Sequence, residues 1–352
     1  MKKSQWILGL VVLAALAGLV VWGRGRIHFN FAVFRSQWEL ADRRGIAIAL
    51  GCIYLGYVFR AVRWAALLRH IKKVPPFSLL GTQVIGFTAV ALIGRFADPV
   101  RPYLVAKKTG LPLSNQIAVY IVERLFDAGS MALIFCSVML LAPPGALPHA
   151  EVMKRISYGA LVTTVAGALF LVAVRMAGET VASFAEGIFG TVSKGLGRAA
   201  GEKIRSFRSG LDILRSVADF ALAAALSLFM WGLITLSYLE VTRAFVASPQ
   251  LAHLTLAKCM LLMASSMAVS GFQLPILGWF SQIGLVAAAM SAFFGVAAEP
   301  ATACAATLLA VTFLAIVPVG LVWAQLEHVS LRKIAQESER AEENLAAEEP
   351  AG

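Results

Sequence analysis

Charged and phenolic side chains cluster in two short stretches of an otherwise apolar part of the chain. The first stretch runs from Gly94 to Tyr103 and the second from Val122 to Asp127. Because charge within hydrocarbon is costly, such side chains usually mark a functional site. The pattern predicts a site for a charged ligand inside a membrane protein. Its candidate residues are Arg95, Asp98, Arg101, Tyr103, Glu123, Arg124 and Asp127.

Arginine and carboxylate side chains at this spacing can handle a phosphate group. A guanidinium donates two parallel hydrogen bonds to phosphoryl oxygens, which suits Arg95 and Arg101 to a lipid phosphodiester. On a helix, Glu123 and Asp127 share a face, and Arg124 can pair with Asp127. Two interpretations stay open and can coexist. The charges give a passing head group a temporary counter-charge, or they form an interhelical network that holds the fold together.

Prolines interrupt the element that carries the first stretch. Pro99 and Pro102 fix φ and lack a backbone N–H donor, so a helix over 79–93 cannot continue unbroken through them. These 15 apolar residues are short for a full crossing, which takes about 20 residues. We therefore expect a re-entrant half-helix that enters from the cytoplasm.

A second short apolar segment, 255–270, runs into a break from Gly271 to Pro275 in the other half of the chain. Short, broken segments at matching places in two halves indicate an inverted repeat with a binding site near the middle of the membrane. Each segment can also be an ordinary proline kink. The candidate residues of this second broken helix are Gln273, Pro275, Gly278 and Gln282.

The composition indicates an integral membrane protein. Of the 352 residues, 59% are hydrophobic and 14% are charged, which is far more apolar than a soluble domain needs. The sequence predicts an all-α polytopic membrane protein of about eight transmembrane helices with two re-entrant or broken helices. The expected crossings are 6–22, 45–68, 116–141, 157–174, 218–240, 276–296 and 301–325, and 27–38 is expected at the interface.

The net charge of +11 is spread in short basic runs beside apolar segments. No soluble region is long enough to present these runs to a duplex, which excludes nucleic acid, so anionic lipid head groups are the expected partner. Arg60, Arg63 and Trp64 stand near the end of a predicted span. They form a candidate head-group anchor, or simply the basic and aromatic residues that commonly flank a span.

The distribution of basic residues also predicts the orientation. Placing both termini in the cytoplasm puts most Lys and Arg inside, although the first external loop breaks this rule with five arginines. We expect a membrane domain over 1–326, a cytoplasmic loop over 175–217 and a largely disordered cytoplasmic tail over 327–352. The first apolar run resembles a signal peptide, but no small-residue cleavage site follows it, which favours an uncleaved anchor.

Motifs for cofactor or nucleophilic chemistry are missing from the sequence. Four cysteines lie in apolar runs without a Cys-x-x-Cys pair, and five histidines are scattered without metal-ligand spacing. The cysteines are interpreted as packing residues rather than as a disulfide or metal site. There is no P-loop, no Gly-x-Ser-x-Gly and no dinucleotide fingerprint. We expect no cofactor and no metal, and a protein that is not an enzyme.

The chain resembles a known family through three motifs. They are Phe59-Arg60-Ala61-Val62-Arg63-Trp64, the stretch from Gly94-Arg95 to Arg101-Pro102, and Glu123-Arg124-Leu125-Phe126-Asp127. With these motifs it resembles the lysylphosphatidylglycerol synthase transmembrane-region family of flippase-like membrane proteins, over nearly its whole length. The resemblance implies a bacterial inner-membrane protein that binds and translocates an anionic phospholipid, an aminoacyl-phospholipid or a lipid-linked precursor.

The second half departs from the pattern of that family. Where the family usually shows Pro-Gly-Gly-x-Gly-x-x-Glu, the acidic residue is replaced here by Ser281 or Gln282. An arginine often found in the last span is replaced by an apolar or hydroxyl residue around Val311 and Thr312. Removing both members of a buried pair is tolerated better than removing one. The departure therefore implies a changed substrate, or reduced activity.

Two other functions stay open. Some relatives carry a soluble synthase domain that these 352 residues lack, so the chain can be an accessory membrane subunit for a separately encoded lipid-modifying enzyme. It can also be a membrane transferase with Asp98 or Glu123 as general base. The transferase needs a water-exposed pocket with a carboxylate free of its arginines. The accessory subunit needs a sealed charged cluster beside a large exposed apolar patch.

Overall fold

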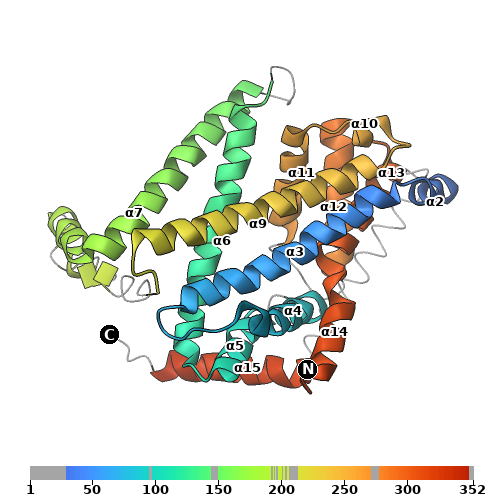
Figure 1. The fold of residues 1–352 in the computed structure, drawn as a ribbon. Helices are drawn as coiled ribbons and strands as arrows, with labels where there is room; N and C mark the ends of the chain where they lie inside the picture. Colours follow the sequence, from blue (N-terminus) through green and yellow to red (C-terminus); the bar gives the residue numbers. More distant parts are fainter. Residues whose placement is uncertain are drawn as a thin grey trace, which may run out of the picture.

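The structure is a computed structural model that describes residues 29–94, 97–143, 150–191, 213–270 and 277–348, with parts of 193–205. All regular elements in these ranges are helices, which confirms the predicted all-α class (Figure 1). The predicted span over 6–22 and three candidate site residues, Arg95, Gln273 and Pro275, lie outside the described residues.

The described helices run from Phe31 to Glu348. They are α2 (Phe31–Glu39), α3 (Arg43–Leu68), α4 (Pro76–Ile93), α5 (Val100–Thr109), α6 (Leu113–Leu140), α7 (Ala150–Gly190), α9 (Val217–Ala244), α10 (Pro249–Ala252), α11 (Leu256–Ser270), α12 (Leu277–Phe294), α13 (Ala298–Leu309), a π-helical turn (Ala310–Leu314), α14 (Ile316–Leu326) and α15 (Leu331–Glu348). In this part of the chain five helical stretches are long and apolar enough to cross a membrane, namely α3, α4, most of α7, α9 and the continuous stretch Ala298–Leu326.

The two long helices α3 and α9 lie side by side and antiparallel through the middle of the molecule (Figure 1). Asp42, which caps the start of α3, donates its backbone N–H to Ala244 O at the end of α9. Helix α4 packs on α3 and α14, while α6 and α7 form an open hairpin whose α6 arm crosses α9. This arrangement brings α3, α4, α5, α6 and α9 together around one buried region.

Local sequence signals set the helix ends near that region. The Asp42 carboxylate caps α3 by accepting from Arg44 N and Gly45 N, and Ser216 forms a capping box with Asp219 at the start of α9. Helix α4 ends at Gly94, whose φ of 93° favours glycine. These caps satisfy backbone groups that the helices leave unpaired at their ends.

The predicted break after α4 is present, and its geometry explains the prolines. Pro99 immediately precedes α5, and Pro102 lies in the first turn of α5. Backbone N–H groups in the first turn have no acceptor within the helix, so a proline there costs no helical hydrogen bond. Helix α4 begins at Pro76, three residues earlier than the predicted segment, so its 18 residues are enough to cross by length and composition. The re-entrant form of this segment stays a prediction.

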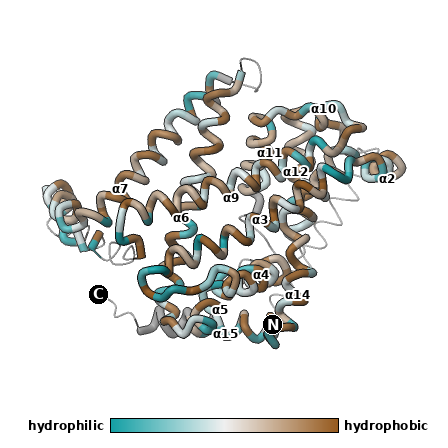
Figure 2. The backbone as a smooth tube through the Cα atoms, viewed as in Figure 1, coloured by the Kyte–Doolittle hydropathy of each residue, from teal (hydrophilic) through white to brown (hydrophobic). Residues whose placement is uncertain are grey.

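Hydrophobic residues predominate along α6, α7 and α9, and hydrophilic residues gather at the turn between α3 and α4 (Figure 2). Helix α7 exposes large apolar side chains along its length, among them Val162, Leu169 and Phe184. An apolar surface this extended is unfavourable in water and matches contact with lipid. The described helices are thus those of a multi-pass membrane protein.

Two segments are more helical than the sequence indicates. Helix α7 continues to Gly190 with a kink at Ala177, where a loop is predicted from Arg175 onward. Helix α15 spans Leu331–Glu348, within the tail over 327–352 for which disorder is predicted. The composition of the tail conceals a short apolar face, since Ile334 is buried, Leu331 and Ala335 pack beside it, and α15 contacts α5.

Candidate functional site

Two carboxylates, Glu123 and Asp127, form the centre of a charged cluster inside the protein. They are four residues apart on α6 and both are buried. Four guanidinium groups surround them: Arg60 and Arg63 from α3, Arg101 from α5 and Arg124 from α6 itself. Glu123 and Asp127 thus lie on one face of α6, as predicted. Arginines from three helices surround them.

Arg63 links both carboxylates to α9. Its Nη2 donates to Glu123 Oε1 and its Nη1 to Asp127 Oδ1, each at 2.6 Å, and Nη1 also donates to Ser227 Oγ at 2.6 Å. The side chain is 1% exposed. Breaking such a buried pair leaves an uncompensated charge, which costs about 3–5 kcal/mol.

Two of the three residues predicted as a head-group anchor are therefore internal. Arg63 pairs with α6, and Trp64 is buried with its indole N–H donated to Gln116 Oε1 at 3.0 Å. The turn of α3 points both side chains toward α6 rather than toward lipid. Of the three residues, Arg60 alone lines a cavity of the described structure.

Arg101 holds α5 against α4 and α6. Its Nη2 donates to Glu123 Oε2 at 2.7 Å, and its Nε and Nη2 donate to Gln83 Oε1 at 3.1 and 2.7 Å. The guanidinium carbon lies 4.3 Å from the centroid of the Phe87 ring, and the side chain is 1% exposed. Arg101 is thus enclosed by partners on α4 and α6.

The close approach of α4 to Arg101 depends on Gly86. A Cβ at Gly86 would clash with Cγ of Arg101, whereas a Cβ at Gly129 on α6 would meet nothing within 4 Å. We expect Gly86→Ala to lower the free energy of unfolding by about 1–3 kcal/mol, because overpacking displaces the enclosed Arg101. A thermal melt in detergent measures this loss, with Gly129→Ala as the matched control. Equal melting temperatures for the two variants would contradict the packing.

Arg60 and Arg124 form the outer part of the cluster. Arg60 Nη1 lies 3.4 Å from Asp127 Oδ2, and Arg124 Nη2 lies 3.1 Å from the same oxygen, as the i, i+3 spacing predicts. However, neither Nε nor Nη2 of Arg124 makes a hydrogen bond with any described residue, although both atoms are buried. Nη2 still has Asp127 as its ion-pair partner, whereas Nε has no acceptor. A buried donor without an acceptor is costly, and a ligand oxygen would relieve that cost.

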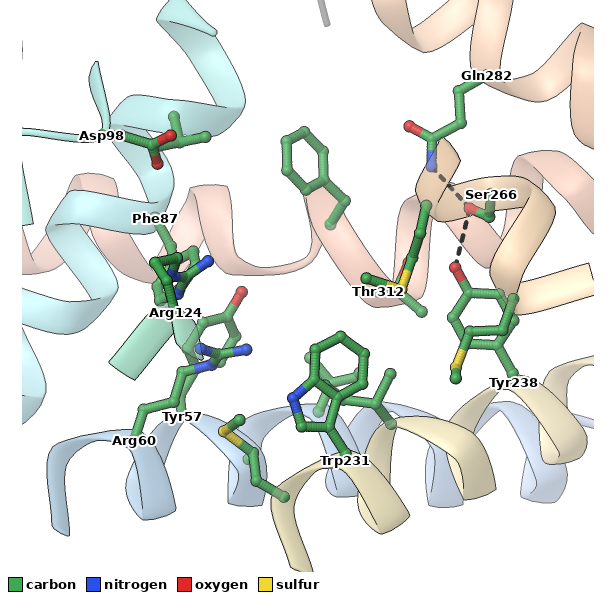
Figure 3. Close-up of a pocket in the computed structure, with 18 residues that line it drawn as sticks. Tyr57, Arg60, Phe87, Asp98, Arg124, Trp231, Tyr238, Ser266, Gln282 and Thr312 are labelled. Atoms are coloured by element: carbon green, nitrogen blue, oxygen red, sulfur yellow. Dashed lines mark hydrogen bonds between the residues drawn. The ribbon is translucent and has the colours of Figure 1, made fainter. Parts of the chain in front are cut away.

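A cavity of about 220 Å³ borders this outer part. On one side lie Arg60, Arg124 and Asp98, the last in the connection between α4 and α5 (Figure 3). On the opposite side lie polar groups from the second half of the chain. These groups are Tyr238, Ser266, Gln282 and Thr312. The remaining lining is aromatic and aliphatic and includes Tyr57, Phe87, Met230, Trp231 and Met263.

The structure brings together most, but not all, of the candidate residues. Asp98, Glu123, Arg124 and Asp127 meet Arg60, Arg63 and Arg101 in the cluster or on the cavity wall, and Gln282 joins from α12. Gly278 lies one turn before Gln282. Tyr103 faces away and donates to Glu337 of α15 at 3.1 Å. Burial, followed by that carboxylate, raises the pKa of Tyr103.

Several site residues were not singled out from the sequence. Gln83 accepts from Arg101, Trp231 donates its indole N–H to Asp127 Oδ1 at 3.3 Å, and Ser266 accepts from two cavity residues. Polar side chains within apolar helices are the signal that could have identified Gln83 and Ser266. All four cysteines are buried and free, and no group of metal-binding side chains occurs among the described residues.

A family model described as the lysylphosphatidylglycerol synthase TM region matches residues 6–321. The chain belongs to this family. The matched residues include every arginine and carboxylate of the cluster and both walls of the cavity. Neither the curated proteins nor the solved structures give a match to the chain. The family and the apolar helices identify a multi-pass membrane protein of a lipid-modification and flippase-like class.

Proposed function

We propose that the cavity binds the head group of an anionic phospholipid or lipid-linked precursor, and that the protein moves this lipid between the leaflets of the bacterial inner membrane. The observation that carries the proposal is the buried Nε of Arg124 beside the cavity, which makes no hydrogen bond with any described residue. Phosphoryl oxygens are strong acceptors for guanidinium groups.

The charge of the cluster supports a negatively charged ligand. Arg60, Arg63, Arg101 and Arg124 carry four positive charges, and Glu123 and Asp127 carry two negative charges, which leaves a surplus of two. Asp98 on the cavity wall reduces the surplus to one. A surplus of positive charge in a low-dielectric interior attracts an anion strongly.

The surroundings of the cluster suit the lipid tails. An apolar groove of about 550 Å³ lies between α6, α7 and α9, where Phe126, Phe170 and Phe220 are among the lining residues. Helix α6 therefore turns a charged face toward α3 and an apolar face toward this groove. A lipid needs both environments, one for its phosphate and one for its acyl chains.

The transferase alternative finds less support in this geometry. Glu123 accepts hydrogen bonds from Arg63 and Arg101 within the closed cluster, so it has no position from which to take a proton from a substrate. Asp98 is the cavity carboxylate that such a reaction would have to use. Membrane placement with both termini in the cytoplasm rests on the basic residues of the sequence and belongs to the same proposal.

Leaflet exchange of a fluorescent phosphatidylglycerol in proteoliposomes, read by dithionite quenching, tests the proposal. We expect Arg124→Gln to slow exchange by roughly tenfold or more, since a charged hydrogen bond to phosphate is lost. The side chain is 39% exposed, and Arg60 and Arg63 still pair with Asp127 without it, so the melting temperature should fall less than in a variant of Arg63. The matched control is Arg243→Gln at the exposed end of α9. Unchanged exchange in Arg124→Gln would contradict the assignment of the phosphate site.

A further inference from the structure

We propose that the lipid taken by this cavity carries a single phosphodiester charge and a neutral, hydroxyl-bearing head group such as glycerol or a sugar, and not an amine or aminoacyl group. This inference rests on the proposed lipid binding and names its substrate class. It follows from the cavity wall that faces the arginines, from the charge of the described residues, and from the size of the cavity.

The wall opposite the arginines is neutral and hydrogen-bonded. Tyr238 donates its hydroxyl to Ser266 Oγ at 3.0 Å, and Gln282 donates its carboxamide N–H to the same oxygen at 3.1 Å (Figure 3). Thr312 from the π-helical turn lies beside them. Among the described residues that line this side, none carries a charge. Hydroxyl and carboxamide groups both donate and accept hydrogen bonds, which matches the hydroxyls of a polyol.

An ammonium group would have no counter-charge on that wall. Carboxylates stabilise the ammonium groups of lysyl and other amine-bearing head groups. The carboxylate among the described cavity residues, Asp98, lies on the arginine side. There it lies with Arg60 and Arg124 around the place assigned to the phosphate. A buried ammonium without a carboxylate pays a desolvation cost that hydroxyls do not.

The charge balance points the same way. Among the described residues of the cluster and cavity, four arginines and three carboxylates leave a net charge of +1. One phosphodiester, with a single negative charge, neutralises this surplus. A zwitterionic lipid leaves the surplus in place, and an aminoacyl lipid with extra positive charge adds to it. In a medium of low dielectric such an imbalance is unfavourable.

The size of the cavity limits the part of the lipid that it can hold. Its volume of about 220 Å³ is below the roughly 300 Å³ at which pockets for drug-sized molecules begin. A phosphate with a small polyol matches this volume, and the acyl chains must lie outside it, along the apolar surface. The arginines then contact the phosphate while the Tyr238, Ser266 and Gln282 wall contacts the hydroxyls.

The test compares lipids that differ only in the head group and carry the same acyl-chain fluorophore. Wild-type protein in proteoliposomes is expected to exchange phosphatidylglycerol at least roughly tenfold faster than phosphatidylethanolamine or lysyl-phosphatidylglycerol. Equal rates, or faster exchange of an amine-bearing lipid, would overturn the inference. If wild-type protein exchanges no lipid at all, the proposed function fails and this inference fails with it, so the two failures are distinguishable.

Gln282→Glu supplies the decisive variant, because it places a carboxylate on the neutral wall. We expect it to lower the exchange rate of phosphatidylglycerol and to raise that of phosphatidylethanolamine, each by roughly tenfold. The matched control is Gln250→Glu on α10, which makes the same chemical change at an exposed position. An unaltered lipid preference in a folded Gln282→Glu protein would overturn the inference. If that variant does not fold, Tyr238→Phe replaces it. Tyr238→Phe should lower the exchange rate of phosphatidylglycerol and leave that of phosphatidylethanolamine unchanged.

Discussion

Replacing Arg63 by methionine is expected to lower the free energy of unfolding by about 3–5 kcal/mol. The substitution removes the guanidinium that donates to Glu123, Asp127 and Ser227, each at 2.6 Å. Methionine fills much of the volume but leaves two buried carboxylates with fewer partners. The loss is measured as a fall in melting temperature of the purified protein in detergent.

Arg243→Met at the exposed end of α9 is the matched control for this prediction, since it makes the same substitution at an exposed position. Surface substitutions of this kind usually change stability by less than about 0.5 kcal/mol. If Arg63→Met melts at the same temperature as Arg243→Met, the Arg63 guanidinium does not hold the cluster together.

Glu123→Gln is expected to be nearly as harmful, and Arg101→Gln should relieve part of the loss. Without the carboxylate, Arg101 keeps Gln83 as its remaining described hydrogen-bond acceptor and becomes a buried charge without a counter-ion. Removing one member of such a pair costs about 3–5 kcal/mol, whereas removing both costs less. The double variant Glu123→Gln/Arg101→Gln should therefore melt at a higher temperature than Glu123→Gln alone.

The distances also identify which arginine can provide this relief. Arg124 Nη2 lies 3.9 Å from Glu123 Oε2, against 2.7 Å for Arg101 Nη2, so Arg124→Gln should recover little. A double-mutant cycle on the melting temperatures separates the two pairs. A larger coupling for Glu123 with Arg124 than with Arg101 would contradict the arrangement of the cluster.

The charged cluster could be predicted from the sequence in its membership more than in its geometry. Charge within apolar helices indicated Asp98, Arg101, Glu123, Arg124 and Asp127, and helical spacing indicated the Arg124 to Asp127 pair. Local spacing carries no information on contacts between helices that are distant in sequence. For that reason the sequence indicates an anchor or an ordinary flanking basic residue at Arg63, near the end of a predicted span, although α3 directs it into the cluster.

Helix lengths show the same division between local and tertiary information. The start of α9 and the break after α4 follow from capping residues, Gly94 and the prolines, which act within a few residues. The extension of α7 to Gly190 and the formation of α15 could not be predicted in this way. Helix α15 is stabilised by burying Ile334 against a region that includes α5, a contact that its acidic composition conceals.

The cavity could be anticipated only in part. The sequence paired the two broken segments as the sides of one site, and the structure places Asp98 and Gln282 on opposite walls of one cavity. Its aromatic and methionine lining comes from α3, α4, α9, α11 and the π-helical turn, which the sequence treats as separate apolar runs. Periodicity identifies such residues as buried but does not say which cavity they enclose.

The central claim is that the arginine wall of this cavity binds a lipid phosphate and lets the lipid change leaflets. Its most direct test is dithionite quenching of fluorescent phosphatidylglycerol in proteoliposomes that contain wild-type or Arg124→Gln protein at equal amounts. We predict that wild-type protein exposes the inner-leaflet lipid to quenching. Protein-free vesicles keep this inner-leaflet lipid, about half of the total label, protected, and Arg124→Gln vesicles approach that protection. Equal protection in wild-type and protein-free vesicles would contradict the account.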